Sequence, residues 1–325
     1  MRFHLRSVWR VSLFAGVLLV GSAAATVRAQ SGNPLLDDLM KTGVPMGQAG
    51  ARTLRPPTLP DGLSAAEQRK AIEAVLAVRP GQPLDYAGFT APGLNTPHVF
   101  IIDDAKLAPA TGPGHTTDLW FTVHDKLAKV AAPGFLRAQF KPGPKNRLDT
   151  LQAADLKQRN IAEKKIAGGK ESYAHATSLI FPTDVRVQVD ATGRAVQTTT
   201  DTSTTLASLI DPRFDNDATF PNQWRPVLRA ADGSILRDAA GKLQLGNPTP
   251  YESAGGYTKV TELVEPAGTL LVEYHLVYDE PYGWFSGADL LRPKLYQQTQ
   301  EDVQTFRKKL RLSPMPAASP PPAQK

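Results

Sequence analysis

Apolar and polar residues alternate most clearly along two stretches near the C-terminal end of the chain, residues 257–265 and 269–278. This period of two is typical of β-strands, in which successive side chains point to opposite faces of a sheet. A Pro-Ala-Gly connection at 266–268 supplies a glycine for the turn, so the pattern predicts an antiparallel hairpin. In its second strand, the residues predicted to face the core are Leu270, Val272, Tyr274, Leu276 and Tyr278, and those predicted to face solvent are Glu273, His275 and Asp279.

Further short runs rich in β-branched and aromatic residues lie earlier in the chain, at 98–103, 118–124, 179–181, 185–189 and 195–199. Turn-forming residues flank most of these runs, as is usual where strands end, and the tripeptide 191–193 is predicted to turn the chain between the last two. Successive strands with few helices between them favour antiparallel pairing. The sequence therefore predicts an α+β fold, mainly an antiparallel β-sheet or sandwich with a few peripheral helices.

Three segments carry helix signals. Residues 64–78 begin with Ser64 and Glu67 at the spacing of a capping box and continue with an apolar face. Residues 150–167 predict a second, less regular helix that ends at a pair of glycines. Residues 299–311 predict a final helix that docks on the sheet through three apolar residues and carries cations in its last turns.

The two ends of the chain differ in composition from its centre. Residues 1–29 combine arginines, a short apolar run and small residues before Ala29, so they predict a signal peptide and export to the periplasm or exterior. Residues 30–62 are dense in proline and glycine and predict an extended lead-in, and residues 313–325 predict a proline-rich, disordered tail. Residues 63–312 form the predicted globular, strand-rich region, with a split into two domains near residue 170 as the alternative.

The charge of the chain changes when the predicted signal peptide is set aside. Residues 1–29 hold four of the 37 basic residues and none of the 31 acidic residues, which leaves 33 basic and 31 acidic residues in the rest of the chain. A nucleic-acid-binding protein needs a surplus of Lys and Arg, so this balance argues against nucleic acid as a partner. The chain has no cysteine, which excludes disulfides, thiol catalysis and cysteine metal sites.

Common catalytic motifs are missing from the sequence. It contains no GxxxxGK[ST] loop, no GxSxG elbow, no SxxK, no HExxH and no regular EF-hand loop. No cofactor is predicted, except that a divalent metal remains an option at one cluster. This cluster comprises His115, Asp118 and His124, whose imidazoles and carboxylate are groups that bind zinc. The spacing is not diagnostic of a metal site, and surface histidines and turn-forming aspartates explain the same residues.

A second group of titratable residues lies on and after the last predicted strand. Its members, Glu273, His275, Asp279 and Glu280, are the weak catalytic candidates, because paired carboxylates can support glycoside cleavage. The loop that follows holds aromatic and acidic residues suited to stacking on sugars and accepting their hydroxyl hydrogen bonds. These ligand-binding candidates are Tyr282, Trp284, Phe285 and Asp289, and the alternative is that the rings cover the open end of the sheet.

The sequence thus favours an exported protein without catalytic activity, either structural or a binding module, with an envelope polymer or another protein as its partner. The alternative is a hydrolase of the periplasm or exterior, assisted by a metal at His115, Asp118 and His124 or by the carboxylates around Glu273. No transmembrane segment is predicted after removal of residues 1–29.

Overall fold

The computed structural model describes residues 32–47, 50–79, 83–105, 114–139, 147–180, 187–279 and 291–312. The predicted signal peptide and the proline-rich tail lie outside the described residues, as do Glu280 and the aromatic loop 281–289. Within the described part of the chain, no helix is both long and apolar enough to span a membrane.

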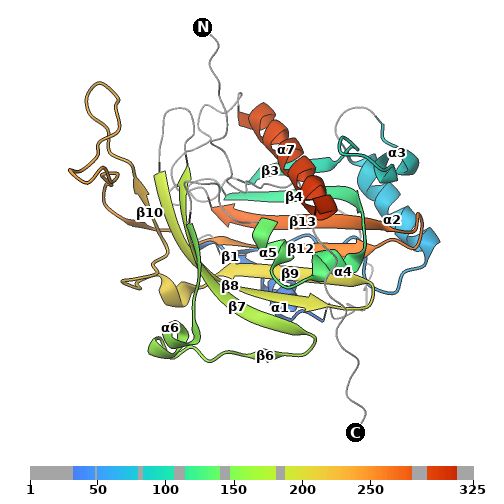
Figure 1. Ribbon diagram of the computed structural model, residues 1–325, viewed down its shortest axis with the longest axis horizontal. Coiled ribbons are helices and arrows are strands. Elements are labelled where there is room, and N and C mark those ends of the chain that lie inside the picture. The colour runs from blue at the N-terminus through green and yellow to red at the C-terminus, as the bar shows by residue number, and fades with distance from the viewer. Residues whose placement is uncertain are drawn as a thin grey trace.

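One large antiparallel sheet dominates the described structure and confirms the predicted α+β class (Figure 1). Eleven strands of the described residues belong to it, and their main path runs β11-β10-β8-β9-β12-β13-β4-β3. Strand β7 pairs with the other edge of β8, and the short β5 and β6 pair with β7. The strands are β3 (Val99–Ala105), β4 (Gly114–His124), β5 (Arg147–Thr150), β6 (Lys165–Ile166), β7 (Gly169–Ile180), β8 (Val187–Thr199), β9 (Ser203–Ile210), β10 (Gln223–Pro226), β11 (Thr249–Pro250), β12 (Ala254–Glu262) and β13 (Thr269–Asp279).

Helices cover one face of this sheet, which we call the inner face. Figure 1 shows α7 (Leu291–Leu312) lying across β3, β4 and β13, with α4 (Leu127–Ala131) and α5 (Phe135–Gln139) on the same side. The apolar residues of α7 that pack there, Val303, Phe306 and Leu310, are the three that the sequence assigned to docking. Their partners on the sheet include Phe100, Phe121, Leu206, Val260, Leu270 and Val272.

The opposite, outer face is covered by N-terminal elements. Helix α1 (Pro34–Thr42) packs with the short β1 (Val44–Pro45) against β8, β9, β12 and β13, while β1 pairs with β2 (Ala51–Arg52). Helices α2 (Ala65–Ala77) and α3 (Tyr86–Thr90) pack against β3, β4 and β13. The prediction that the second hairpin strand exposes one face to water is therefore wrong, since elements more than 170 residues earlier bury it.

The sequence predicted correctly those elements that depend on residues close together in the chain. The capping box of Ser64 and Glu67 is formed at the start of α2, and β12 and β13 form the predicted hairpin. Within the predicted lead-in, however, Asn33 accepts a hydrogen bond from the Leu36 backbone and Pro34 occupies the first turn, so α1 begins there. Proline is well suited to a first helical turn because no intrahelical bond needs its missing N–H.

Three predicted boundaries differ from the structure. The segment predicted to be helical at 150–167 contains only α6 (Ala153–Gln158), because Asn160 takes a left-handed backbone conformation with φ of 56° and β6 follows. The tripeptide 191–193 does not turn but continues β8 through its pairing with β7 and β9. Helix α7 begins at Leu291 instead of near Thr299, with Pro293 in its first turn.

The short helix η2 (Pro212–Phe214) follows β9, and its Phe214 belongs to the same apolar cluster as Tyr173 of β7. Residue 170, near which a domain split was the alternative, lies inside β7 and is paired with β8 in the common sheet.

Candidate functional site

A hollow on the inner face, which we call the inner pocket, lies over strands β7, β8, β9, β12 and β13 and has a volume of about 260 Å³. Small residues form much of its floor because they recur at every second position of their strands, where side chains share a face. These residues are Ala174 and Ala176 on β7, Ala191, Gly193 and Ala195 on β8, and Gly256 on β12. Leu148, Leu206, Ile210 and Leu276 add larger apolar walls.

Small side chains at these positions leave space that leucine or valine would fill. At Gly256 the reason is also steric, since an added Cβ would lie 2.2 Å from the backbone oxygen of His275. Glycine at position 256 therefore allows the backbones of two strands to come close together. The inner pocket therefore combines an apolar floor with open volume, as small-molecule sites usually do.

One charged residue reaches the inner pocket from α5. The guanidinium of Arg137 donates a hydrogen bond to the Ser172 hydroxyl, and both residues line the pocket. Burial lowers the pKa of Arg137, because removal from water disfavours the charged form. No carboxylate of the described residues pairs with this guanidinium. An anion placed beside Arg137 would therefore gain a partner that the protein itself does not supply.

The outer face carries a second group of polar residues, and here two sets of sequence candidates meet. Asp118 on β4 lies opposite His275 on the neighbouring β13, and its Oδ1 is 2.6 Å from His275 Nδ1. Glu273 Oε2 lies 3.5 Å from His275 Nε2. Both Glu273 and His275 have no exposed surface, and Asp118 is 6% exposed. The imidazole thus lies between two buried carboxylates.

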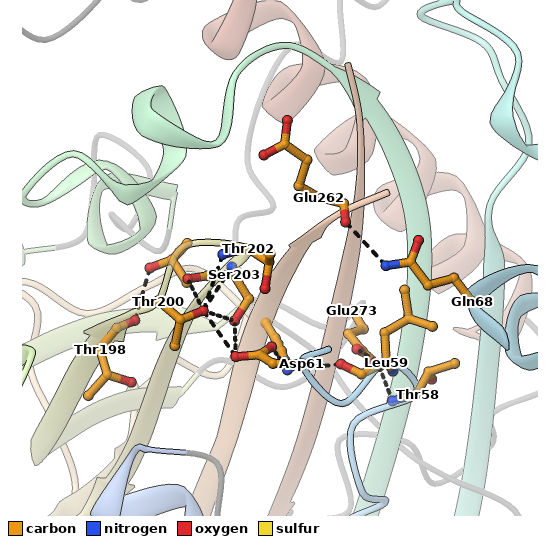
Figure 2. A network of polar contacts seen from close by, with 12 residues as sticks. Thr58, Leu59, Asp61, Gln68, Thr198, Thr200, Thr202, Ser203, Glu262 and Glu273 are labelled. Atoms are coloured by element: carbon orange, nitrogen blue, oxygen red, sulfur yellow. Dashed lines mark hydrogen bonds and ion pairs between the residues drawn. The ribbon is translucent and has the colours of Figure 1, made fainter. Parts of the chain in front are cut away.

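Residues 54–62, which we call the strap, close this cluster from solvent. Figure 2 shows the strap beside Glu273, with the backbone N–H of Thr58 donating to Glu273 Oε2 at 2.7 Å. Arg55 Nε lies 2.8 Å from Asp118 Oδ2, and Lys259 on β12 pairs with Asp61 at 2.8 Å. The strap contains three prolines, which have no N–H and so disfavour pairing of the strap as a strand. Because the strap does not pair in this way, the N–H of Thr58 is available to a side-chain acceptor.

The rest of the strap network holds its C-terminal end in place. In Figure 2, Asp61 Oδ2 accepts hydrogen bonds from Thr200 at 3.0 Å and Ser203 at 3.2 Å. Gln68 on α2 donates to the Glu262 backbone oxygen at 3.4 Å and so connects α2 to the end of β12. Because Glu273 and His275 have no exposed surface, a substrate could reach them only after the strap had left the sheet.

The pKa values of the cluster follow from competition between burial and charge. Burial opposes the charged imidazole of His275, but Asp118 and Glu273 outweigh it and raise the pKa of His275 above its usual value. Burial also opposes ionisation of Asp118 and Glu273, yet His275 and the other donors lower the pKa of both carboxyls. The geometry therefore favours a charged imidazole between two charged carboxylates.

We expect this cluster to shape the pH dependence of stability. A raised histidine pKa contributes stability below about pH 6.5 that is lost as pH rises through the folded value. Lowered carboxyl pKa values contribute stability above about pH 4 that is lost as pH falls through the folded values. The contribution should therefore be greatest between about pH 4.5 and 6.5. Thermal melts of the wild type and His275→Gln test this, and a difference between the two that is constant from about pH 5 to 9 would contradict it.

The remaining predicted site residues are dispersed. His115 and His124 lie near opposite ends of β4, where His115 stacks on Tyr278 and His124 Nε2 lies 2.9 Å from the Thr90 backbone oxygen. Asp279 ends β13, four residues beyond His275. Within the described residues, no three metal-ligating side chains form a group that could hold an ion. Glu280 and the candidates Tyr282, Trp284, Phe285 and Asp289 lie outside the described residues. The metal, catalytic and aromatic-loop sites stay predictions.

Sequence reasoning did not identify the inner pocket or the strap. The signal for the pocket was present as alanines and glycines at every second position of residues 174–176 and 191–195. Nothing in the sequence pattern, in contrast, indicates that Arg55, Asp61 and Lys259 meet the predicted catalytic residues.

Comparison with known proteins adds little. No protein-family model matches this chain, and neither does any curated protein. Among solved structures, it is similar to human STARD10, with 9% identity, a TM-score of 0.30 and coverage of 82% of this chain and 86% of that one. It is also similar to protein Ms6760 from Mycobacterium smegmatis, with 10% identity, a TM-score of 0.26 and coverage of 63% and 94%. Ara h 8.0201 matches with 10% identity, a TM-score of 0.28 and coverage of 62% and 99%. Values this low support no statement about a ligand or an activity.

Proposed function

We propose that this protein is an exported, non-catalytic binding protein for a small amphipathic molecule with an apolar body and an anionic head group. The observation that carries the proposal is the inner pocket, an apolar hollow with a partly buried arginine that lacks a carboxylate partner among the described residues. Export is supported by the composition of residues 1–29, which lie outside the described residues.

The apolar body of the ligand is the main source of binding energy. Each Å² of apolar surface removed from water contributes about 25 cal/mol, and alanines, glycines and leucines make up much of the lining of the inner pocket. The backbone N–H and C=O groups of the strands that form its floor already form hydrogen bonds with the neighbouring antiparallel strands. A ligand lying on it therefore buries its apolar surface at little polar cost.

The head group is selected by Arg137. A guanidinium forms paired, charge-assisted hydrogen bonds with a carboxylate, and these are stronger than neutral ones. Ser172 accepts one of the N–H groups of Arg137, and other N–H groups of the guanidinium remain for a ligand. The inner pocket should therefore prefer an acid to the alcohol of the same chain length.

Binding of octanoate and octanol to the purified protein tests this preference by calorimetry. We expect octanoate to bind more tightly than octanol, and Arg137→Met to weaken octanoate by about tenfold while leaving octanol nearly unchanged. Methionine keeps the length and apolar contacts of the side chain but removes the charge. Equal affinity of the wild type for acid and alcohol would refute the role of Arg137.

A second variant tests the pocket itself. Ala176→Leu places three additional carbons over the floor and should abolish binding of both octanoate and octanol without lowering the melting temperature. Ala153→Leu is the matched control, since Ala153 is exposed on α6 and the same change should leave binding intact. If octanoate binds the Ala176→Leu protein as tightly as the wild type, the ligand lies elsewhere and the proposal fails.

A further inference from the structure

A second concave region, which we call the outer cleft, lies on the opposite face of the sheet from the inner pocket. Its volume is about 400 Å³, and strands β5, β7, β8 and β10 provide its floor while residues 218–221 form a wall. His175 and Thr177 of β7 line it, whereas Ala174 and Ala176 of the same strand line the inner pocket. The alternation of side chains along β7 therefore separates the two sites.

The imidazole of His175 is the best-defined polar group of the outer cleft. It is 7% exposed, and its Nδ1 lies 2.8 Å from the Thr192 hydroxyl oxygen. That hydroxyl gives its single proton to the Phe220 backbone oxygen at 2.6 Å. Thr192 can therefore only accept from the imidazole, so Nδ1 of His175 must carry the hydrogen.

This proton count leaves Nε2 of His175 as an acceptor. In the part of the chain that the structure describes, Nε2 has no hydrogen-bond partner, and it is not one of the fully sealed polar atoms. It thus faces the outer cleft, which His175 lines. Burial lowers the pKa of His175, which keeps its lone pair available at neutral pH. A ligand must bring a hydroxyl or N–H donor to satisfy it.

The other residues of the outer cleft balance each other in charge and in hydrogen bonding. Arg147 and Arg225 contribute two positive charges, and Asp149 and Asp190 contribute two negative ones. Arg147 pairs with Asp149 at 2.5 Å, so no net field selects an ion. Phe220, whose ring centroid lies 5.5 Å from that of His175, adds an apolar contact. Donors on the arginines and acceptors on the aspartates, next to a ring, suit a ligand rich in hydroxyl groups.

We propose that the outer cleft binds a neutral sugar unit, one hydroxyl of which donates its hydrogen to Nε2 of His175. Each sugar hydroxyl can donate and accept at once, so it matches the mixture of carboxylate, guanidinium and threonine groups around the cleft. The C–H surface of the sugar then lies against Phe220. This inference is independent of the ligand proposed for the inner pocket, because the two sites lie on opposite faces of the sheet.

The test is a calorimetric titration of the full-length protein with cellotriose, maltotriose, xylotriose and triacetylchitotriose, combined with NMR of the His175 imidazole. We expect at least one of these neutral trisaccharides to bind and to shift the His175 resonances. His175→Asn places an amide N–H where Nδ1–H was and so keeps the bond to Thr192, but it removes the acceptor at Nε2. This variant should bind the trisaccharide about tenfold more weakly and melt close to the wild type.

Two controls separate the acceptor from a general effect of mutation. His175→Gln places an amide near Nε2 but gives up the bond to Thr192, so it should retain more binding than His175→Asn. His98→Asn changes a histidine that lines a different cleft and should not alter trisaccharide binding. The pocket-filling variant Ala176→Leu should also bind the trisaccharide normally, so failure of one proposal is distinguishable from failure of the other.

The dependence on pH gives a further readout. The charged groups facing His175 are Arg147 and Asp149 on β5, Asp190 on β8, and Asp217 in the loop after η2. Protonation removes the lone pair of Nε2, so affinity should fall in the wild type, but not in His175→Asn, as the pH drops below about 6.5 through the lowered pKa of His175. Absence of trisaccharide binding, or binding that His175→Asn leaves unchanged, would overturn the proposal, and so would binding of charged sugars alone.

Discussion

Replacing Glu273 with alanine is expected to lower the free energy of unfolding by about 3 to 5 kcal/mol, the cost of removing one partner from a buried charge cluster. The side chain of Glu273 has no exposed surface and lies beside His275, and it accepts the Thr58 N–H of the strap. Its loss leaves a buried imidazolium with a single carboxylate and a buried N–H without an acceptor. Urea unfolding of the two proteins measures the difference.

The strap gives this prediction a local readout. Because Thr58 and Leu59 both contact the Glu273 carboxylate, the strap should open more often in Glu273→Ala, and the backbone amide hydrogens of the strap should exchange with solvent faster than in the wild type. Glu73→Ala is the matched control, since Glu73 forms an exposed ion pair with Arg69 on α2 and its loss should change stability far less than the loss of Glu273. Equal stability of both variants would show that the buried cluster does not hold the strap.

Replacing Gly256 with alanine is expected to destabilise the protein by about 3 kcal/mol, at the upper end for overpacking in a core. The added Cβ would lie 2.2 Å from the backbone oxygen of His275 and 2.7 Å from Cα of Leu276. Backbone atoms in the centre of a sheet cannot rotate away, so β12 and β13 would have to separate. Since these two strands carry both the inner pocket and the charge cluster, binding of octanoate should weaken as well.

The neighbouring glycine offers a matched control for this effect. At Gly255 an added Cβ would meet Cδ1 of Leu209 at 2.7 Å and Cγ2 of Val44 at 3.0 Å, which are the ends of side chains that can change rotamer. Gly255→Ala should therefore cost clearly less than Gly256→Ala in the same thermal melt. If the two variants melt at the same temperature, backbone proximity is not the reason for a glycine at position 256.

The sequence by itself determined the elements that depend on residues close together in the chain. The capping box at Ser64 is local to one turn, and the hairpin of β12 and β13 needs only alternating residues and a short connection. The apolar positions of α7 were also correct, because a helix presents the same face at intervals of three and four residues. These features sufficed for the fold class and for the antiparallel pairing.

Only the tertiary structure decided which faces of these elements are covered, and therefore where the sites lie. Glu273 and His275 were correctly placed on one face of a strand. The strap that buries them lies about 200 residues earlier, and its sequence contains no pattern that predicts contact with this strand. The acceptor at His175 likewise depends on a proton that Thr192 gives to Phe220 across a loop. Periodicity assigns a side chain to a face, whereas burial, tautomer and charge depend on long-range packing that periodicity does not encode.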